Sequence, residues 1–248
     1  MSRLRGGAVA LAVAGVLFLA YPAVRPWHDE TTVAGATRSM GSTAWVAAHF
    51  FAMVGFILLP LGVLAVQKLV AATPAARLAS AATVVTWAGV GLTLPYYGAE
   101  DFGLHAIAGP KGHGADLLAV VDAVRFQPLA VTIFGLGLLL LAVGSVMVAV
   151  AVWRSGVLPR WSGILYGVGF GLFLPQFFGP PPVRIAHGAV TALGAILLAV
   201  AVWSARTDAA EVTEPAEATE PARAPVAGQP WARSMLRHWA AVIGRPSR

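Results

Sequence analysis

Residues 129–152 read LAVTIFGLGLLLLAVGSVMVAVAV and carry no charged side chain. An α-helix rises about 1.5 Å per residue and the hydrocarbon core of a bilayer is about 30 Å thick, so about 20 apolar residues are enough to cross it. The segment meets that length, and its only hydroxyl side chains belong to Thr132 and Ser145. It is therefore predicted to form a transmembrane helix.

Five other segments of the chain have the same apolar character. They are residues 6–24, 44–66, 78–95, 161–178 and 185–205. Of the 248 residues, 58% are hydrophobic and 11% are charged, whereas soluble domains carry about 25% charged residues. The sequence therefore predicts an all-α, polytopic membrane helix bundle with six transmembrane helices within residues 1–206.

The positions of Lys and Arg predict the orientation of this bundle, because cytoplasmic loops retain positive charge. With both termini inside, the cytoplasmic segments hold twelve basic side chains and the opposite side holds five. Six of the twelve follow residue 205, so the short loops alone give six against five. We expect an N-in/C-in topology, which the even number of spans also requires.

The two ends of the chain extend this interpretation. Arg3 and Arg5 precede the first apolar run as in a signal peptide, but no small-x-small cleavage site follows, so an uncleaved span is expected. Residues 207–230 repeat Thr-Glu-Pro and are predicted to be a disordered linker. Residues 231–245 place Trp and Leu opposite Arg on a helical wheel, which predicts a cytoplasmic amphipathic helix that binds anionic lipid.

Several classes of function are excluded by what the sequence lacks. Without any Cys, the chain has no disulfides, thiolate metal sites, iron–sulfur clusters or cysteine nucleophiles. The net charge of +6 arises beside apolar runs, where lipid headgroups and topology explain it, so no nucleic-acid partner is expected. Nucleotide-binding loops and Gly-x-Ser-x-Gly elbows are absent. The lipid bilayer is the expected partner, while the cofactor and the oligomeric state stay open.

Ionisable residues gather between the third and fourth predicted spans. Such side chains are costly at membrane depth and usually face a cavity or a partner. If this segment is helical, Asp101 and His105 lie four residues apart on one face, and Asp122 and Arg125 lie three apart. One interpretation makes Glu100 or Asp101 a general acid or base, oriented by His105, with Arg125 or Arg184 holding charge. The alternative is a solvated surface with weak ion pairs.

Four polar residues lie in or beside the outer halves of the predicted spans: His49, Gln176, Arg184 and His187. The two histidines have similar depth and three interpretations: structural hydrogen bonding, axial ligation of one haem iron, or a metal or acid–base site. No His-x-x-x-His motif is present, so no metal ligand is assigned. Arg184 suits a carboxylate or a phosphate headgroup as a binding partner, or else it snorkels from the end of the span.

Two further patterns concern packing. Gly163, Gly167 and Gly171 recur every four residues in the fifth predicted span and predict the close approach of another helix. Tryptophans are predicted to anchor the bundle at the membrane interfaces. They are Trp27, Trp45, Trp153, Trp161 and Trp203.

Residues 153–203 read WRSGVLPRWSGILYGVGFGLFLPQFFGPPPVRIAHGAVTALGAILLAVAVW. This segment resembles the uncharacterised Ala-, Gly- and Leu-rich multi-pass membrane proteins of actinobacteria, which implies a bacterial cytoplasmic membrane and no particular activity. The residues leave three functions open. The first is a binder of a small or lipid-like ligand at an outward-facing His/carboxylate site. The others are an intramembrane enzyme acting on a lipidic, isoprenoid-like substrate and a bis-His haem electron carrier.

Overall fold

The computed structural model describes residues 3–109 and 116–211, and every regular element within these ranges is a helix. Five of these helices are long and apolar enough to cross a membrane. They are α1 (Arg3–Val24), α3 (Thr43–Leu69), α4 (Ala76–Gly98), α7 (Pro128–Ser155) and α9 (Pro181–Glu211). The shorter elements are α2 (Val33–Met40), the π-helix η1 (Ala99–Gly103), α5 (Leu104–Ala108), α6 (Leu117–Arg125), the 3₁₀ helices η2 (Arg160–Gly163) and η3 (Pro175–Phe178), and α8 (Ile164–Gly171).

Long helices cover four of the predicted spans. These four are residues 6–24, 44–66, 129–152 and 185–205. The helix α9 continues to Glu211 and so enters the segment predicted to be a linker. The rest of that linker and the predicted amphipathic helix at residues 231–245 lie outside the described residues.

The third predicted span is helical well beyond its expected end at Pro95. The helix α4 continues through η1 and α5 as far as Ala108. Pro95 lacks its own N–H donor, but its carbonyl still accepts a hydrogen bond from the backbone of Ala99, so the helix passes through it. The π turn that follows changes the directions of the side chains it carries, which include Glu100 and Asp101.

The fifth predicted span, residues 161–178, is not one continuous helix. It is divided into η2, the eight-residue α8 and η3, with a turn at residues 172–174. Pro175 has no N–H to donate, so α8 does not continue into η3. Within the described residues, five rather than six helices are therefore long enough to cross a membrane.

Glycines allow η2 and α8 to lie close against α7. A Cβ on Gly163 would lie 3.1 Å from the Cα of Ala149 on α7, and one on Gly167 would lie 3.0 Å from its Cβ. These contacts confirm the close approach predicted for the first two glycines. Gly171 has no neighbour within 4 Å and takes no part in it.

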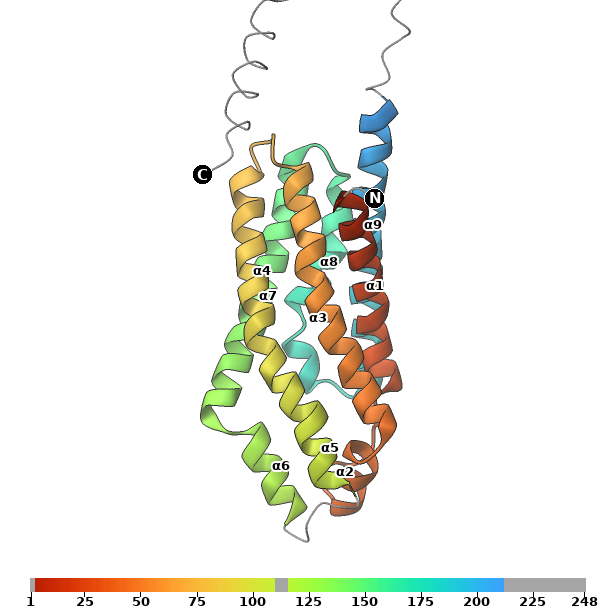
Figure 1. The fold of residues 1–248 in the computed structure, drawn as a ribbon, viewed down its shortest axis with the longest axis vertical. Helices are drawn as coiled ribbons and strands as arrows, with labels where there is room; N and C mark the ends of the chain where they lie inside the picture. The colour runs from red at the N-terminus through yellow and green to blue at the C-terminus, as the bar shows by residue number, and fades with distance from the viewer. Residues whose placement is uncertain (1–2, 110–115, 212–248) are drawn as a thin grey trace, which may run out of the picture. The chain divides into compact units, whose positions relative to one another are not determined.

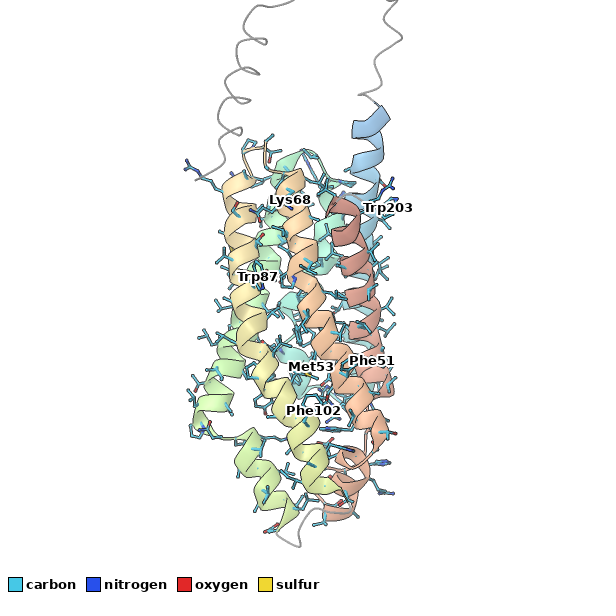
Figure 2. The ribbon with its side chains drawn as sticks, viewed as in Figure 1. Phe51, Met53, Lys68, Trp87, Phe102 and Trp203 are labelled. Atoms are coloured by element: carbon cyan, nitrogen blue, oxygen red, sulfur yellow. The ribbon has the colours of Figure 1, made fainter. Side chains whose placement is uncertain are left out.

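The membrane-length helices and α8 form a closed ring. Each contacts the next in the order α1, α3, α4, α7, α8, α9, and α9 returns to α1. Figure 1 shows the long helices side by side with roughly parallel axes. Their outer surfaces expose large apolar side chains, among them Trp87 of α4 and Trp203 of α9 (Figure 2). Such a surface fits lipid tails, because contiguous apolar patches of this kind are rare in water.

The elements α2, α5 and α6 lie together at the end of the ring where α1 finishes (Figure 1). We call these three elements the cap. A small hydrophobic core joins the cap to the start of α3, and its buried members are Ala36, Met40, Trp45, Leu104, Ala108 and Val121. The prediction that Trp45 anchors at a bilayer interface is wrong, because its side chain is fully buried in this core.

The close packing of the ring predicts that one added methyl group at a helix contact destabilises the protein. A Cβ at Gly194 of α9 would overlap the backbone of Leu165 and Tyr166 in α8. Gly194→Ala should therefore lower the free energy of unfolding by about 1 to 3 kcal/mol, the usual cost of overpacking, measured by thermal unfolding in detergent. Gly91→Ala is the matched control, since Gly91 has no neighbour within 4 Å. Equal stability of the two variants would contradict this packing.

Candidate functional site

A cavity of about 420 Å³ lies where the ring meets the cap. Its walls come from the helices α1, α3, α4, α7 and α9, from η1, from η3 and the turn before it, from the loop after α1, and from the end of α6. The charged residues that line it are Arg25, Glu30, Glu100, Arg125 and Arg184. The remaining polar lining residues are His49, Tyr21, Tyr96 and Tyr97. The cavity therefore gathers ionisable side chains from segments far apart in the sequence.

The loop between α1 and α2 holds two of the charged residues in place. The indole nitrogen of Trp27 donates to a carbonyl in the last turn of α1 at 3.0 Å, which satisfies an acceptor that the helix end leaves free. Asp29 accepts hydrogen bonds from the side chain and backbone of Thr31, and these bonds lower the pKa of the Asp29 carboxyl. This turn carries Glu30 back toward Arg25 at the end of α1.

Two arginines and two glutamates form a continuous chain of ion pairs. Arg25 Nη2 lies 2.7 Å from Glu30 Oε1, and Arg125 Nη2 lies 2.9 Å from Glu30 Oε2. Arg125 also binds Glu100 in a bidentate manner, with distances of 2.7 and 3.0 Å. Burial acts to lower the pKa of Arg125, but the carboxylates of Glu100 and Glu30 together raise it above its ordinary value. Arg125 therefore stays charged and bridges the two carboxylates.

The side chain of Trp45 contacts this chain of ion pairs. Its ring lies 4.7 Å from the guanidinium carbon of Arg25 and 5.9 Å from that of Arg125. Its indole nitrogen donates to the backbone carbonyl of Glu100 at 2.9 Å. Cations over an indole face are attracted to its π electrons, so Trp45 positions both arginines and the π turn that carries Glu100.

Arg184 lies on another wall of the cavity and is held differently. Its Nε donates to the side-chain oxygen of Gln176 at 3.2 Å. Its guanidinium carbon lies 4.7 Å from the ring of Trp27 and 4.9 Å from that of Phe177. Among the described residues, no carboxylate lies within 4 Å of Arg184, since both glutamates that line the cavity pair with Arg25 or Arg125.

His49 forms part of an aromatic group in the wall. Its Nδ1 lies 2.9 Å from the backbone carbonyl of Trp45, so this nitrogen carries the proton and Nε2 is left as an acceptor. The His49 ring lies 5.4 Å from that of Tyr21 and 6.0 Å from that of Tyr97. The Tyr97 hydroxyl is buried and has no hydrogen-bond partner within the described chain.

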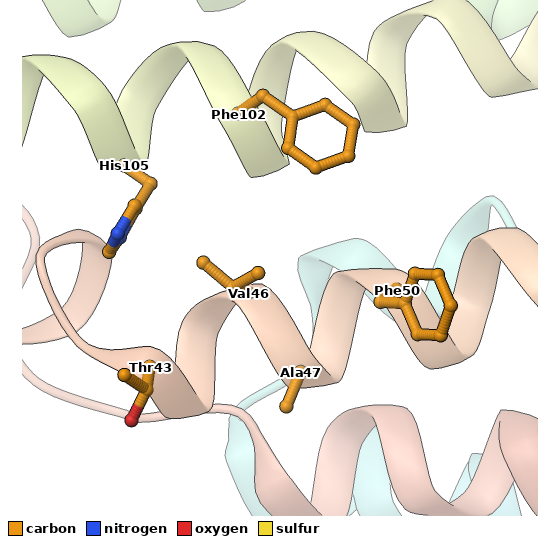
Figure 3. Close-up of a pocket in the computed structure, with 6 residues that line it drawn as sticks. All are labelled: Thr43, Val46, Ala47, Phe50, Phe102 and His105. Atoms are coloured by element: carbon orange, nitrogen blue, oxygen red, sulfur yellow. The ribbon is translucent and has the colours of Figure 1, made fainter.

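The three residues predicted to act as catalysts do not converge on this cavity. Glu100 lines it, in its ion pair with Arg125. Asp101 is fully buried and is not a lining residue, and its two oxygens have no hydrogen-bond partner among residues 3–109 and 116–211. His105 lines a separate hollow against the start of α3 (Figure 3) and makes a 2.8 Å contact to the Met40 carbonyl. In the described chain, no ion pair joins Asp101 to His105.

The remaining predicted ligands have separate partners. His187 Nε2 donates to the backbone carbonyl of Gly169 at 2.7 Å, so its use as an axial haem ligand through this atom requires that bond to break. Neither His187 nor Gln176 lines the cavity, although Gln176 holds Arg184. Within the part of the chain that the structure describes, no three His, Asp or Glu side chains lie close enough to hold a metal ion.

Sequence reasoning missed several residues that build the site. Arg25 and Glu30 flank Trp27 directly after the first span. An opposite-charge pair beside a tryptophan at a membrane boundary could have indicated that the two residues form an ion pair there. The spacing of Asp122 and Arg125 allowed an ion pair between them, but Arg125 binds Glu30 and Glu100. Nothing in a single sequence indicates that residues 30 and 125 meet, because their contact depends on how the cap folds over the ring.

The ion-pair chain predicts a strong effect of Glu100→Gln. This change removes one of the two carboxylates that balance Arg125, and breaking a largely buried pair leaves an uncompensated charge. The free energy of unfolding should fall by about 2 to 4 kcal/mol, measured by thermal or denaturant unfolding in detergent. Asp122→Asn is the control, because Asp122 is exposed and the described residues include no ion-pair partner for it. If both variants unfold like the unaltered protein, the bridge is not structural.

No protein-family model, curated protein or solved structure matches this chain. The resemblance of residues 153–203 to actinobacterial multi-pass proteins therefore stays a prediction.

Proposed function

We propose that this chain is an integral membrane protein that binds an amphipathic, lipid-like molecule in the cavity between the ring and the cap. The observation that carries the proposal is the mixed lining of the cavity. Five charged side chains line it, and so do apolar and aromatic side chains, which we call the apolar part of the lining. A ligand with a polar head and an apolar tail can contact both kinds of side chain.

The apolar part of the lining extends to the outer surface of the protein. Phe134, Phe177 and Leu174 line the interior. Phe126 and Phe178, which also line the cavity, are 68% and 86% exposed. Apolar side chains exposed at a cavity rim fit a surrounding of lipid tails better than water. We therefore propose that the ligand enters from the bilayer.

We further propose that six segments cross the membrane and that both termini face the cytoplasm. Residues 160–178 begin beside the opposite end of the ring and reach the cavity at Leu174, which supports a broken sixth crossing. Arg25 and Arg125 are paired with carboxylates at the cap end. Their positive charges are therefore weaker evidence that this end of the protein faces the cytoplasm. With this orientation, the cap and the cavity face the outside of the cell. The membrane that we propose is the bacterial cytoplasmic membrane, as the sequence indicated.

The arrangement favours binding over catalysis. A general acid or base must reach the proton that it transfers. Glu100 instead shares both oxygens with Arg125. Asp101 and His105 lie outside the cavity lining. Binding is therefore the function that these side chains support best.

The experiment uses a rim residue to narrow the cavity. Val131 lines the cavity and is 42% exposed, so Val131→Trp fills its mouth without entering the core. Lipid occupancy should fall about tenfold, measured by native mass spectrometry after incubation with phosphatidylglycerol and phosphatidylcholine. Val143→Trp is the matched control, because Val143 is exposed on the same helix and does not line the cavity. Unaltered occupancy in both variants, or no bound lipid in the parent protein, would overturn the proposal.

A further inference from the structure

We propose that Arg184 binds an oxyanion, the phosphate or carboxylate head of the amphipathic ligand. This inference rests on the proposed function and adds the charge of the ligand to it. It starts from an imbalance of charge, since three arginines but only two carboxylates line the cavity. An anionic head would restore the balance.

Arg184 is held by three contacts that leave its terminal donors unused. Trp27 and Phe177 lie against its guanidinium, and Gln176 accepts from its Nε. Its two terminal nitrogens have no acceptor within the described residues. A guanidinium offers a planar fork that matches the paired oxygens of a phosphate or carboxylate. A fork that is already fixed in position loses little freedom when an anion arrives.

The other two arginines cannot replace Arg184 in this role. Arg125 contributes its Nε and one terminal nitrogen to the carboxylates of Glu30 and Glu100. Arg25 contributes one terminal nitrogen to Glu30 and the other to a backbone carbonyl. Their positive charges are balanced within the protein, whereas that of Arg184 is not.

Two more donors in the cavity wall lack acceptors. The Nε of Arg25 and the hydroxyl of Tyr97 are buried, and neither has a hydrogen-bond partner among the described residues. Both residues line the same cavity as Arg184. Buried donors without partners are unfavourable, so native structures rarely keep them unless a ligand or water supplies the acceptor. An oxyanion can supply acceptors to both of these groups and to Arg184 at the same time.

The position of Arg184 also fits a headgroup. It lies in the first turn of α9 at the cap end, where a lipid headgroup sits relative to a membrane-spanning helix. The apolar part of the lining can then accept the tail. A carboxylate or phosphate on an acyl chain satisfies both parts at once.

The test compares three dioleoyl lipids that differ in head charge, together with oleate, a single-chain anion of the same chain type. Purified protein in dodecyl maltoside is titrated with oleate, dioleoyl phosphatidylglycerol, dioleoyl phosphatidylcholine and a dioleoyl trimethylammonium lipid. We expect the two anions to bind at least about tenfold more tightly than the cationic lipid. Competition by millimolar inorganic phosphate distinguishes a free oxyanion from a lipid headgroup as the ligand. If phosphate displaces the bound anionic lipid, the oxyanion alone is sufficient for binding. If it does not, the ligand is the lipid. Both results support an oxyanion site.

Arg184→Gln should remove the preference for anions, so that the anionic and cationic lipids bind with similar affinity. Arg184→Lys should keep part of the preference for anions, because the positive charge remains while the planar fork of the guanidinium is lost. Arg38→Gln is the control, since Arg38 is an exposed cation at the same end of the protein and does not line the cavity. Equal affinity for anionic and cationic lipids would overturn the inference and leave the proposed function standing. Absence of binding by every lipid would overturn both.

Discussion

The bridge that Arg125 makes between Glu30 and Glu100 is the interaction on which the candidate site depends. It joins the loop after α1, the π turn after α4 and the end of α6, three segments that the ring alone would not bring together. Charges removed from water are stable only when their partners are close and well oriented. The bidentate contact and the indole of Trp45 meet this requirement. The cap is therefore held over the ring by charge as well as by its small core.

This bridge gives the cavity its chemical character. Because Arg125 and Arg25 are balanced by glutamates, the net charge of the site depends on Arg184, which is held by aromatic rings and an amide rather than by an acid. The apolar part of the lining continues to exposed phenylalanines. The protein thus contains a polar pocket at one end of an apolar ring, with an opening suited to lipid.

Composition and the length of apolar runs predicted the helical membrane class and most helix positions, because crossing a bilayer requires long stretches without charge. The broken segment at residues 161–178 was predicted to be continuous, since hydropathy does not register where Pro175 and the turn before it interrupt hydrogen bonding. Glu100, Arg125, Arg184 and His49 were predicted and line one cavity. Asp101 and His105 were predicted beside them but face elsewhere, because the π turn alters the directions in which neighbouring side chains point.

The most direct test of this account is an experimental structure of the protein in nanodiscs that contain phosphatidylglycerol. The account predicts elongated density in the cavity, with its charged end within hydrogen-bonding distance of the Arg184 terminal nitrogens and its tail toward Phe126 and Phe178. A cavity closed by side chains, or a carboxylate of the protein itself paired with Arg184, would contradict it.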